Sequence, residues 1–197
     1  MHHQHALPSL ILSLPTQPLT GFASLLQHGI LFPVQQPLSL VPFLLSLPGF
    51  TADYVEKTVQ TIFINGVPAD SLERELVAGT RVALSAAMPG LAGAIFRRQG
   101  VHGSLRSRPQ EKIDPVAAPG GYCTLKLFNS IAYDRIGELL VQGILIEAKA
   151  WHQFARMHAA QLQPPCTLQL DGRAVAVEDL EQSISAESLL RVQAVLV

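Results

Sequence analysis

The chain has 197 residues, of which 48% are hydrophobic and only 15% carry charged side chains. This length suits one domain or two small ones. A typical soluble chain carries about 25% charged residues, so the low charge content predicts a large buried fraction, an oligomer interface, or both. We expect a homo-oligomer, most simply a homodimer. The formal net charge of −1 gives no electrostatic reason to expect nucleic acid or an anionic membrane as a partner.

Residues 1–52 are rich in leucine and proline and contain no Asp, Glu, Lys or Arg. Prolines interrupt the apolar run before it reaches the roughly 20 residues that a membrane span needs, and no basic segment precedes it as in a secretory signal. We therefore expect no transmembrane segment and a cytoplasmic protein. Because disordered segments are usually polar, this arm is predicted to pack on the body or in a dimer interface. A surface for a membrane or an apolar ligand is the alternative.

Three short elements are predicted in this arm. A helix is expected over 20–29, with Thr20 as its N-cap and a glycine at its end. A strand is expected over 29–35, at the edge of a sheet because Pro33 lacks an N–H group. A further helical turn should begin at Pro42, since proline suits the first turn of a helix.

A first α+β unit is predicted over 53–108. The segment 57–66 is rich in β-branched residues and ends in Asn-Gly, which predicts a strand followed by a hairpin turn. Asp70 and Glu73 then form a capping-box pattern, which predicts a short helix. A second strand is expected over 80–87.

The Pro/Gly-rich stretch 109–121 is predicted to be a connector loop, and 122–197 to be a second α+β unit. The segment 144–148 is ambiguous between strand and helix. The other expected elements are a strand over 122–129, a helix over 130–142 that Gly143 ends, a helix over 147–161, a strand, Asp-Gly turn and strand over 166–176, a short acidic helix, and a last strand over 188–197.

Similar letters recur at "TIFING" from 61, "CTLKLFN" from 123 and "CTLQLDG" from 166. Each begins a strand, and two of them continue through a turn and a short polar stretch to a second strand. This pattern indicates a repeated β-hairpin and short-helix unit, with chance similarity between strands as the alternative. The fold class predicted is α+β, with a mixed or antiparallel sheet of short strands and a few packing helices.

The order of elements from "IFING" to "RVALSAAMPG" resembles the closing part of ubiquitin-like sulfur-carrier proteins. The resemblance covers about 30 residues and implies a local β-grasp-like topology. Members of that family end in a diglycine that is activated for sulfur transfer, whereas the Gly-Gly pair here is internal, at Gly120 and Gly121, and the last residues are Leu196 and Val197. The resemblance therefore implies nothing about sulfur chemistry.

The stretch "MPGLAGAIFRRQG" suggests an anion-binding loop. A helix that starts after the Pro-Gly break would present free N–H groups to an anion, and small residues would let it approach. The candidate anion-binding residues are Gly90, Gly93, Arg97, Arg98 and Arg106. The alternative is a turn with a solvated basic edge, because the stretch lacks the lysine and hydroxyl of a Walker loop and the glycine spacing of a dinucleotide loop.

Other side chains suggest metal or nucleophile chemistry less directly. His2, His3 and His5 would form a copper or nickel chelate with a free amino terminus, but a frayed terminus explains them as well. Cys123 and Cys166 lack zinc-site spacing, so we expect reduced thiols, with a bridge between them as the alternative. No cofactor is expected.

A helix over 147–161 would carry His152, Arg156 and His158 on its polar surface. A nucleophilic role for Cys123 would require one of these histidines to reach it, whereas solvated side chains on an amphipathic helix are the simpler explanation. The acidic residues Glu178, Asp179 and Glu181 are likewise expected to be a solvated helix face.

Together these features favour a non-catalytic binding or assembly protein that acts through an apolar N-terminal surface and a basic loop over 97–108. The alternative is a small enzyme that binds a phosphorylated or carboxylated metabolite at the loop from Gly90 to Arg98. Peripheral attachment to a membrane through residues 7–50 is a third hypothesis.

Overall fold

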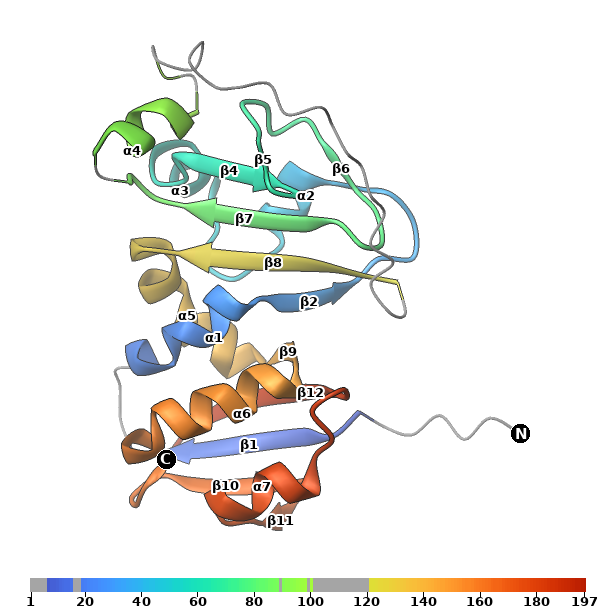
Figure 1. The fold of residues 1–197 in the computed structure, drawn as a ribbon, viewed down its shortest axis with the longest axis vertical. Coiled ribbons are helices and arrows are strands. Elements are labelled where there is room, and N and C mark those ends of the chain that lie inside the picture. The colour runs from blue at the N-terminus through green and yellow to red at the C-terminus, as the bar shows by residue number, and fades with distance from the viewer. Residues whose placement is uncertain (1–6, 16–18, 89, 99, 101–120) are drawn as a thin grey trace. The chain divides into compact units, whose positions relative to one another are not determined.

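The computed structural model describes residues 7–15, 19–88, 90–98, 100 and 121–197. Helices alternate with short strands, which confirms the predicted α+β class (Figure 1). The helices are η1 (Leu19–Phe22), α1 (Ala23–His28), α2 (Leu40–Leu45), α3 (Ala52–Lys57), α4 (Gly90–Phe96), α5 (Ser130–Gln142), α6 (Ala148–Met157), η3 (Ala159–Leu162) and α7 (Val177–Ser183). None of these helices is both long and apolar enough to span a membrane.

The strands form two five-stranded sheets and one small ladder. The first sheet has the order β11 (Arg173–Ala174), β10 (Thr167–Leu170), β1 (Ser9–Leu14), β12 (Leu189–Leu196), β9 (Ile144–Glu147). The second has the order β2 (Ile30–Pro33), β8 (Tyr122–Phe128), β7 (Arg81–Ser85), β4 (Thr61–Ile64), β5 (Val67–Pro68). The ladder pairs β3 (Leu38–Ser39) with β6 (Glu75–Leu76).

The chain divides into two compact units. Unit 1 comprises 1–30 and 136–197, and unit 2 comprises 31–135. These bounds differ from the predicted segments 1–52, 53–108, 109–121 and 122–197. They differ because β1 joins a sheet whose other strands all come from the end of the chain. The second boundary falls inside α5, so one continuous helix belongs to both units.

In unit 1, β1 lies in the middle of its sheet. It runs antiparallel to β10 and parallel to β12, and α6 and α7 lie over one face of this sheet (Figure 1). Leu10 and Leu12 of β1 are buried, while the alternate residues are partly exposed, as the period of two along a strand requires. On α6, Trp151 and Phe154 are buried, whereas Met157 is 59% exposed.

Both sheets carry a tight hairpin at one edge. In unit 2, Asn65 and Gly66 have φ angles of 51° and 81°. In unit 1, Asp171 and Gly172 have φ angles of 50° and 79°. Positive φ at both central residues defines the hairpin turn that Asn-Gly and Asp-Gly sequences favour. Both turns could therefore be predicted from the sequence. The longer repeat remains a prediction.

The helix predicted from the Asp70 capping box is wrong. The hydroxyl of Ser71 accepts a hydrogen bond from the N–H of Glu73 at 2.9 Å, which fixes a local turn instead of starting a helix. Strand β6 follows and pairs with β3, and this pairing buries Leu76 completely. Tertiary pairing therefore overrides the local helix signal.

The described part of 1–52 supplies core side chains. Its fully or almost fully buried members include Leu10, Leu12, Leu25, Leu26, Leu40 and Leu44. The predicted edge strand at Pro33 is β2, and the helix ending at Gly29 is η1 with α1, although Thr20 does not cap it. Helix α2 begins at Leu40, so Pro42 lies within its first turn, where proline costs no hydrogen bond.

Candidate functional site

The predicted anion loop folds as the short helix α4 in unit 2. The helix begins at Gly90, whose φ of 76° lies in the left-handed region that glycine adopts most readily. Gly93 is buried, and a Cβ built on it would lie 1.7 Å from the carbonyl oxygen of Met88. The space beside Gly93 is thus filled by the chain's own backbone.

Arg97 and Arg98 follow α4 in different environments. The N–H of Arg97 donates to the carbonyl of Gly93 at 3.0 Å, and its side chain is exposed. The N–H of Arg98 donates to the carbonyl of Gln60 at 2.7 Å, and its side chain is partly buried. The turn after α4 therefore fastens the backbone of Arg98 to the segment that leads into β4.

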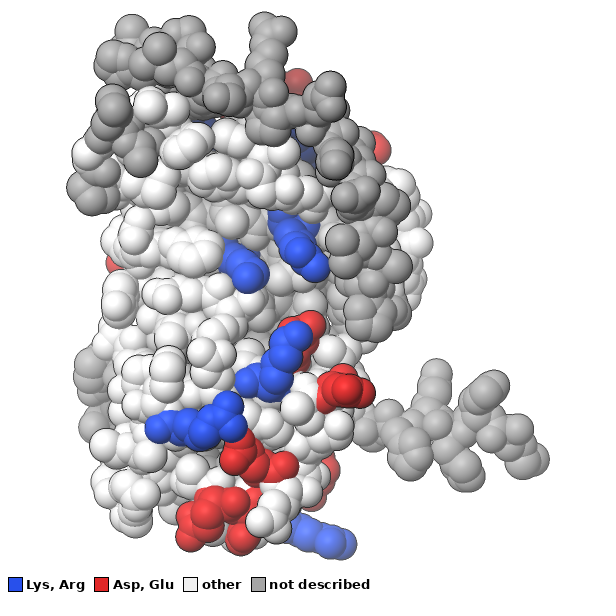
Figure 2. All heavy atoms as spheres, in the orientation of Figure 1, with Lys and Arg blue, Asp and Glu red and all other residues white. Residues whose placement is uncertain are grey.

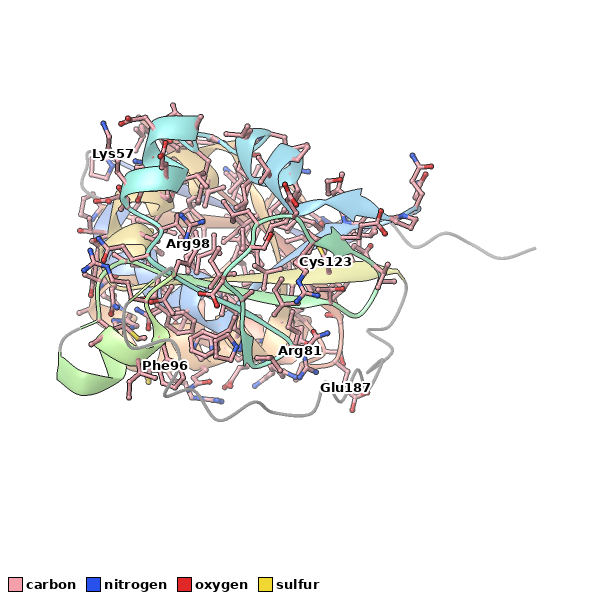
Figure 3. All side chains as sticks on the ribbon, turned by 90° about the horizontal axis from the view of Figure 1, so that it is seen from above. Lys57, Arg81, Phe96, Arg98, Cys123 and Glu187 are labelled. Atoms are coloured by element: carbon pink, nitrogen blue, oxygen red, sulfur yellow. The ribbon has the colours of Figure 1, made fainter. Side chains whose placement is uncertain are left out.

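The charge of Arg98 is partly offset by carboxylates of unit 2. Burial lowers the pKa of Arg98, whereas the charges of Glu56 and Asp70 raise it. Figure 3 shows Arg98 beside α3, the helix that carries Glu56, whereas Phe96 is the last residue of α4. Because two carboxylates act on one guanidinium, the site attracts an anion less than an isolated arginine would.

Two polar atoms next to this turn are buried without a hydrogen-bond partner among the described residues. They are Nε of Arg98 and Oε1 of Gln60. The first is a donor and the second an acceptor. Leaving such groups unsatisfied costs about 1–3 kcal/mol each, so this spot favours a small polar molecule.

The structure places the other candidate anion-binding, metal-binding and nucleophilic residues as follows. Arg106 and the three histidines His2, His3 and His5 lie outside the described residues. Cys123 and Cys166 are both buried free thiols, and burial raises the pKa of each thiol, so neither is an activated nucleophile. In the part of the chain that the structure covers, His, Cys, Asp and Glu side chains form no group of three suited to a metal ion.

The expectation of a solvated His152 is wrong. Its side chain is only 6% exposed, and Nε2 has no hydrogen-bond partner within the described ranges. Arg156, four residues later, is exposed and pairs with Glu181 of α7. Acidic side chains gather around α7 on the face drawn in Figure 2. The pairing supports the view that Glu181 belongs to a solvated surface.

Sequence analysis missed a cluster of aromatic and charged side chains that joins α3 to the start of α5. The hydroxyl of Tyr54 donates to Oδ2 of Asp134 at 2.9 Å, and the guanidinium of Arg135 lies 4.2 Å from the Tyr54 ring centroid. Burial, with a further contribution from the hydrogen bond to Asp134, raises the pKa of Tyr54 to about 12. The cluster was not foreseen because the sequence reading assigned no helix to α3.

Sequence analysis also missed an open strand edge on β12 in unit 1. The antiparallel pairing with β9 ends at Val192, opposite Ile144, whereas the parallel pairing with β1 continues to Leu196. In the described chain, no strand therefore pairs with Gln193–Leu196 on the side away from β1.

Backbone hydrogen bonds show which groups of β12 face this edge. The N–H groups of Arg191 and Val197 donate to Pro8 and Leu14, so odd-numbered residues face β1. The carbonyl of Ser188 accepts from the N–H of Ala148, so even-numbered residues face the β9 side. Because backbone direction alternates along a strand, the N–H and C=O groups of Ala194 and Leu196 point to the open edge.

Exposed apolar side chains accompany the open edge. Val195 is 40%, Leu196 44% and Val197 75% exposed. The last residue of α6, Met157, is also 59% exposed. An exposed strand edge next to apolar side chains is a common docking surface.

The end of α5 marks where the open edge begins. The side-chain amide of Gln193 donates to the carbonyl of Val141 at 2.9 Å, and Arg191 donates to the carbonyl of Gln142 at 3.2 Å. These bonds satisfy carbonyls that a helix end leaves without partners.

No known protein-family profile matches the chain, and its comparison with curated proteins and with solved structures gives no match either.

Proposed function

We propose that this chain is a non-catalytic assembly protein that binds an extended strand along the open edge of β12. The observation that carries the proposal is the pair of outward-facing residues Ala194 and Leu196, whose backbone groups have no strand partner in the described chain. An extended segment placed there would add a strand to the sheet. Backbone hydrogen bonds supply affinity in such complexes, and alternate side chains supply specificity.

The other edges of the two sheets support this choice. Natural sheets protect an edge strand with proline, charge or short length. Strand β2 ends in Pro33, β5 contains Pro68, β11 begins with Arg173 and β9 ends in Glu147. The segment Gln193–Val197 has neither a proline nor a charged residue, so it is the edge that lacks protection against pairing.

The apolar N-terminal segment supports the assembly surface in this proposal without forming it. Its leucines are largely buried within the fold, and β1 holds β12 in place through a six-residue parallel register from Ser9 to Leu14. The proposed binding surface is therefore on β12, beside the N-terminal segment, whereas the sequence analysis expected it on that segment. The proposed class of function, a non-catalytic assembly protein, is the one expected from the sequence.

The experiment is a selection of extended heptapeptides from a random display library. The wild-type protein is used for capture, and the binding of each captured peptide is then measured to the wild type and to a Leu196→Pro variant. Proline at 196 removes an N–H that faces the open edge, but it leaves the donors to β1, which come from odd-numbered residues. We expect peptides with alternating apolar residues that bind the wild type and not the variant.

An Ile11→Val variant is the control, because Ile11 lies on β1 and has no backbone group on the open edge of β12. It should retain the selected peptides. Equal binding of every selected peptide to the wild type and to a folded Leu196→Pro variant would contradict the proposed function.

A second candidate is binding of an acidic or phosphorylated small ligand at Arg98. The unsatisfied Nε donor of Arg98 favours it, and the offsetting charge of Glu56 weakens it. Thermal stabilisation by inorganic phosphate and by small carboxylates tests it in the wild type, in Arg98→Ala and in a control, Lys57→Ala, which removes an exposed cation paired with Asp53. Stabilisation lost only in Arg98→Ala would support the site, and equal responses would remove it.

A further inference from the structure

We infer that the strand taken up at the open edge of β12 is the same strand of a second copy, which makes an antiparallel two-fold pair centred on Val195. This inference rests on the proposed strand-binding edge and names its partner. The same surface would serve both copies, as a two-fold interface requires.

The backbone fixes the register of this pair. Only even-numbered residues of β12 present both N–H and C=O to the edge. In an antiparallel pair, such residues must lie opposite each other. Placing Ala194 opposite Leu196 of the other copy forms two hydrogen-bonded pairs, and it puts Val195 opposite its own equivalent on the two-fold axis.

The side chains are compatible with this register. Within Gln193–Val197 there is no charged residue, so two copies meet without the repulsion that like charges opposite each other produce. Val195 is 40% exposed and would meet its equivalent in a non-hydrogen-bonded pair, where side chains approach most closely. Pairs of β-branched residues at such positions stabilise a sheet.

Exposed apolar side chains around the strand would extend the contact. Leu196 and Val197 are 44% and 75% exposed and follow Val195 directly in the chain. The low overall charge of the chain, 15%, is also what a protein with a buried interface would show. A partner of different chemistry is thus not needed to cover this edge.

The test uses opposite charges at the position on the axis. Sedimentation equilibrium over a wide concentration range is measured for the wild type, Val195→Lys, Val195→Glu and an equimolar mixture of the two variants. We expect a wild-type dimer, dissociation constants raised about tenfold or more in each variant alone because like charges then lie opposite each other, and a restored dimer in the mixture. Restoration by mixing occurs only if residue 195 faces its own equivalent.

The control is Val77→Lys, which replaces another exposed valine, 48% exposed, in unit 2. It should leave the dimer unchanged, and thermal melts should show every variant folded. A wild type that is monomeric at all concentrations, or a dimer that neither Val195 variant weakens, would overturn this inference. The proposed function is tested separately by the peptide selection, so a monomer that still binds peptides through Leu196 would retain the function and lose the dimer.

Discussion

Leu12 of β1 lies in parallel register with Ala194 of β12, and both side chains are at most 1% exposed. The first and last described strands of the chain thus share one core. Leu168 of β10 lies opposite Leu12 on the other side. The N-terminal strand is therefore a central part of unit 1, and it also sets the position of the strand whose outer edge is open.

Replacement of Leu12 by alanine should destabilise the protein by about 2–5 kcal/mol, because it leaves a cavity in the centre of the sheet. Ser13→Ala, at the next position on the opposite, partly exposed face, should change stability by about 0.5 kcal/mol or less. Urea unfolding of the full chain measures both. Similar small effects from the two substitutions would show that β1 is not a core strand.

Replacement of Gly93 by alanine should cost about 1–3 kcal/mol, because the new Cβ would overlap the carbonyl of Met88 and force the backbone to move. The adjacent substitution Ala94→Gly should cost only about 0.5–1 kcal/mol, which is the usual effect of glycine in a helix. Thermal unfolding compares the two. A Gly93→Ala protein as stable as the wild type would contradict the close approach of α4 to Met88.

The protein should lose stability at alkaline pH through Tyr54. The pKa of Tyr54 is raised from 10.0 to about 12, first by burial and then by its hydrogen bond to Asp134. The folded state therefore keeps a proton that the unfolded chain releases, so this contribution is complete below the unfolded pKa and is lost as pH rises through the folded one. Tyr54→Phe should show a smaller decrease in unfolding free energy between about pH 9 and pH 12, measured by urea titration.

Absorbance of tyrosinate offers an independent check. The difference between the titration curves of the wild type and Tyr54→Phe reports the ionisation of Tyr54, which should occur at a higher pH than that of an ordinary tyrosine. An identical alkaline loss of stability in both proteins would mean that Tyr54 does not hold its proton in the folded state.

The two cysteines should react slowly with a thiol reagent while the protein is folded. Cys123 and Cys166 are 1% and 6% exposed, and burial raises the pKa of both thiols, which lowers the thiolate fraction. Both thiols should react promptly in denaturant. Rapid reaction of either cysteine in the native protein, or fewer than two reactive thiols after unfolding without reductant, would contradict two buried free thiols.

Local signals were sufficient for several elements. The helix over Ser130–Gln142 was predicted with its correct ends, because its apolar spacing is regular and Gly143 adopts a φ of 94° that ends it. The two hairpins were predicted because Asn-Gly and Asp-Gly take up the positive φ angles that such turns need. In these cases the conformation depends on neighbours in the sequence.

Elements that depend on distant partners could not be predicted. Strand β1 is short, lies between prolines and pairs only with strands from the end of the chain. The end of pairing on β12 is set by where β9 begins, at Ile144, and no local pattern marks that position. The only sequence signal for the edge is the uncharged run from Val192 to Val197, which becomes informative once the sheet order is known.

Residue-resolved amide hydrogen exchange on β12 tests the open edge most directly, at high protein concentration and at high dilution. The account predicts that the amides of Val195 and Val197, which face β1, are protected under both conditions, whereas those of Ala194 and Leu196 are protected only at high concentration. Fast exchange at Ala194 and Leu196 at every concentration, or protection that does not change with dilution, would contradict a strand edge that pairs with a second copy.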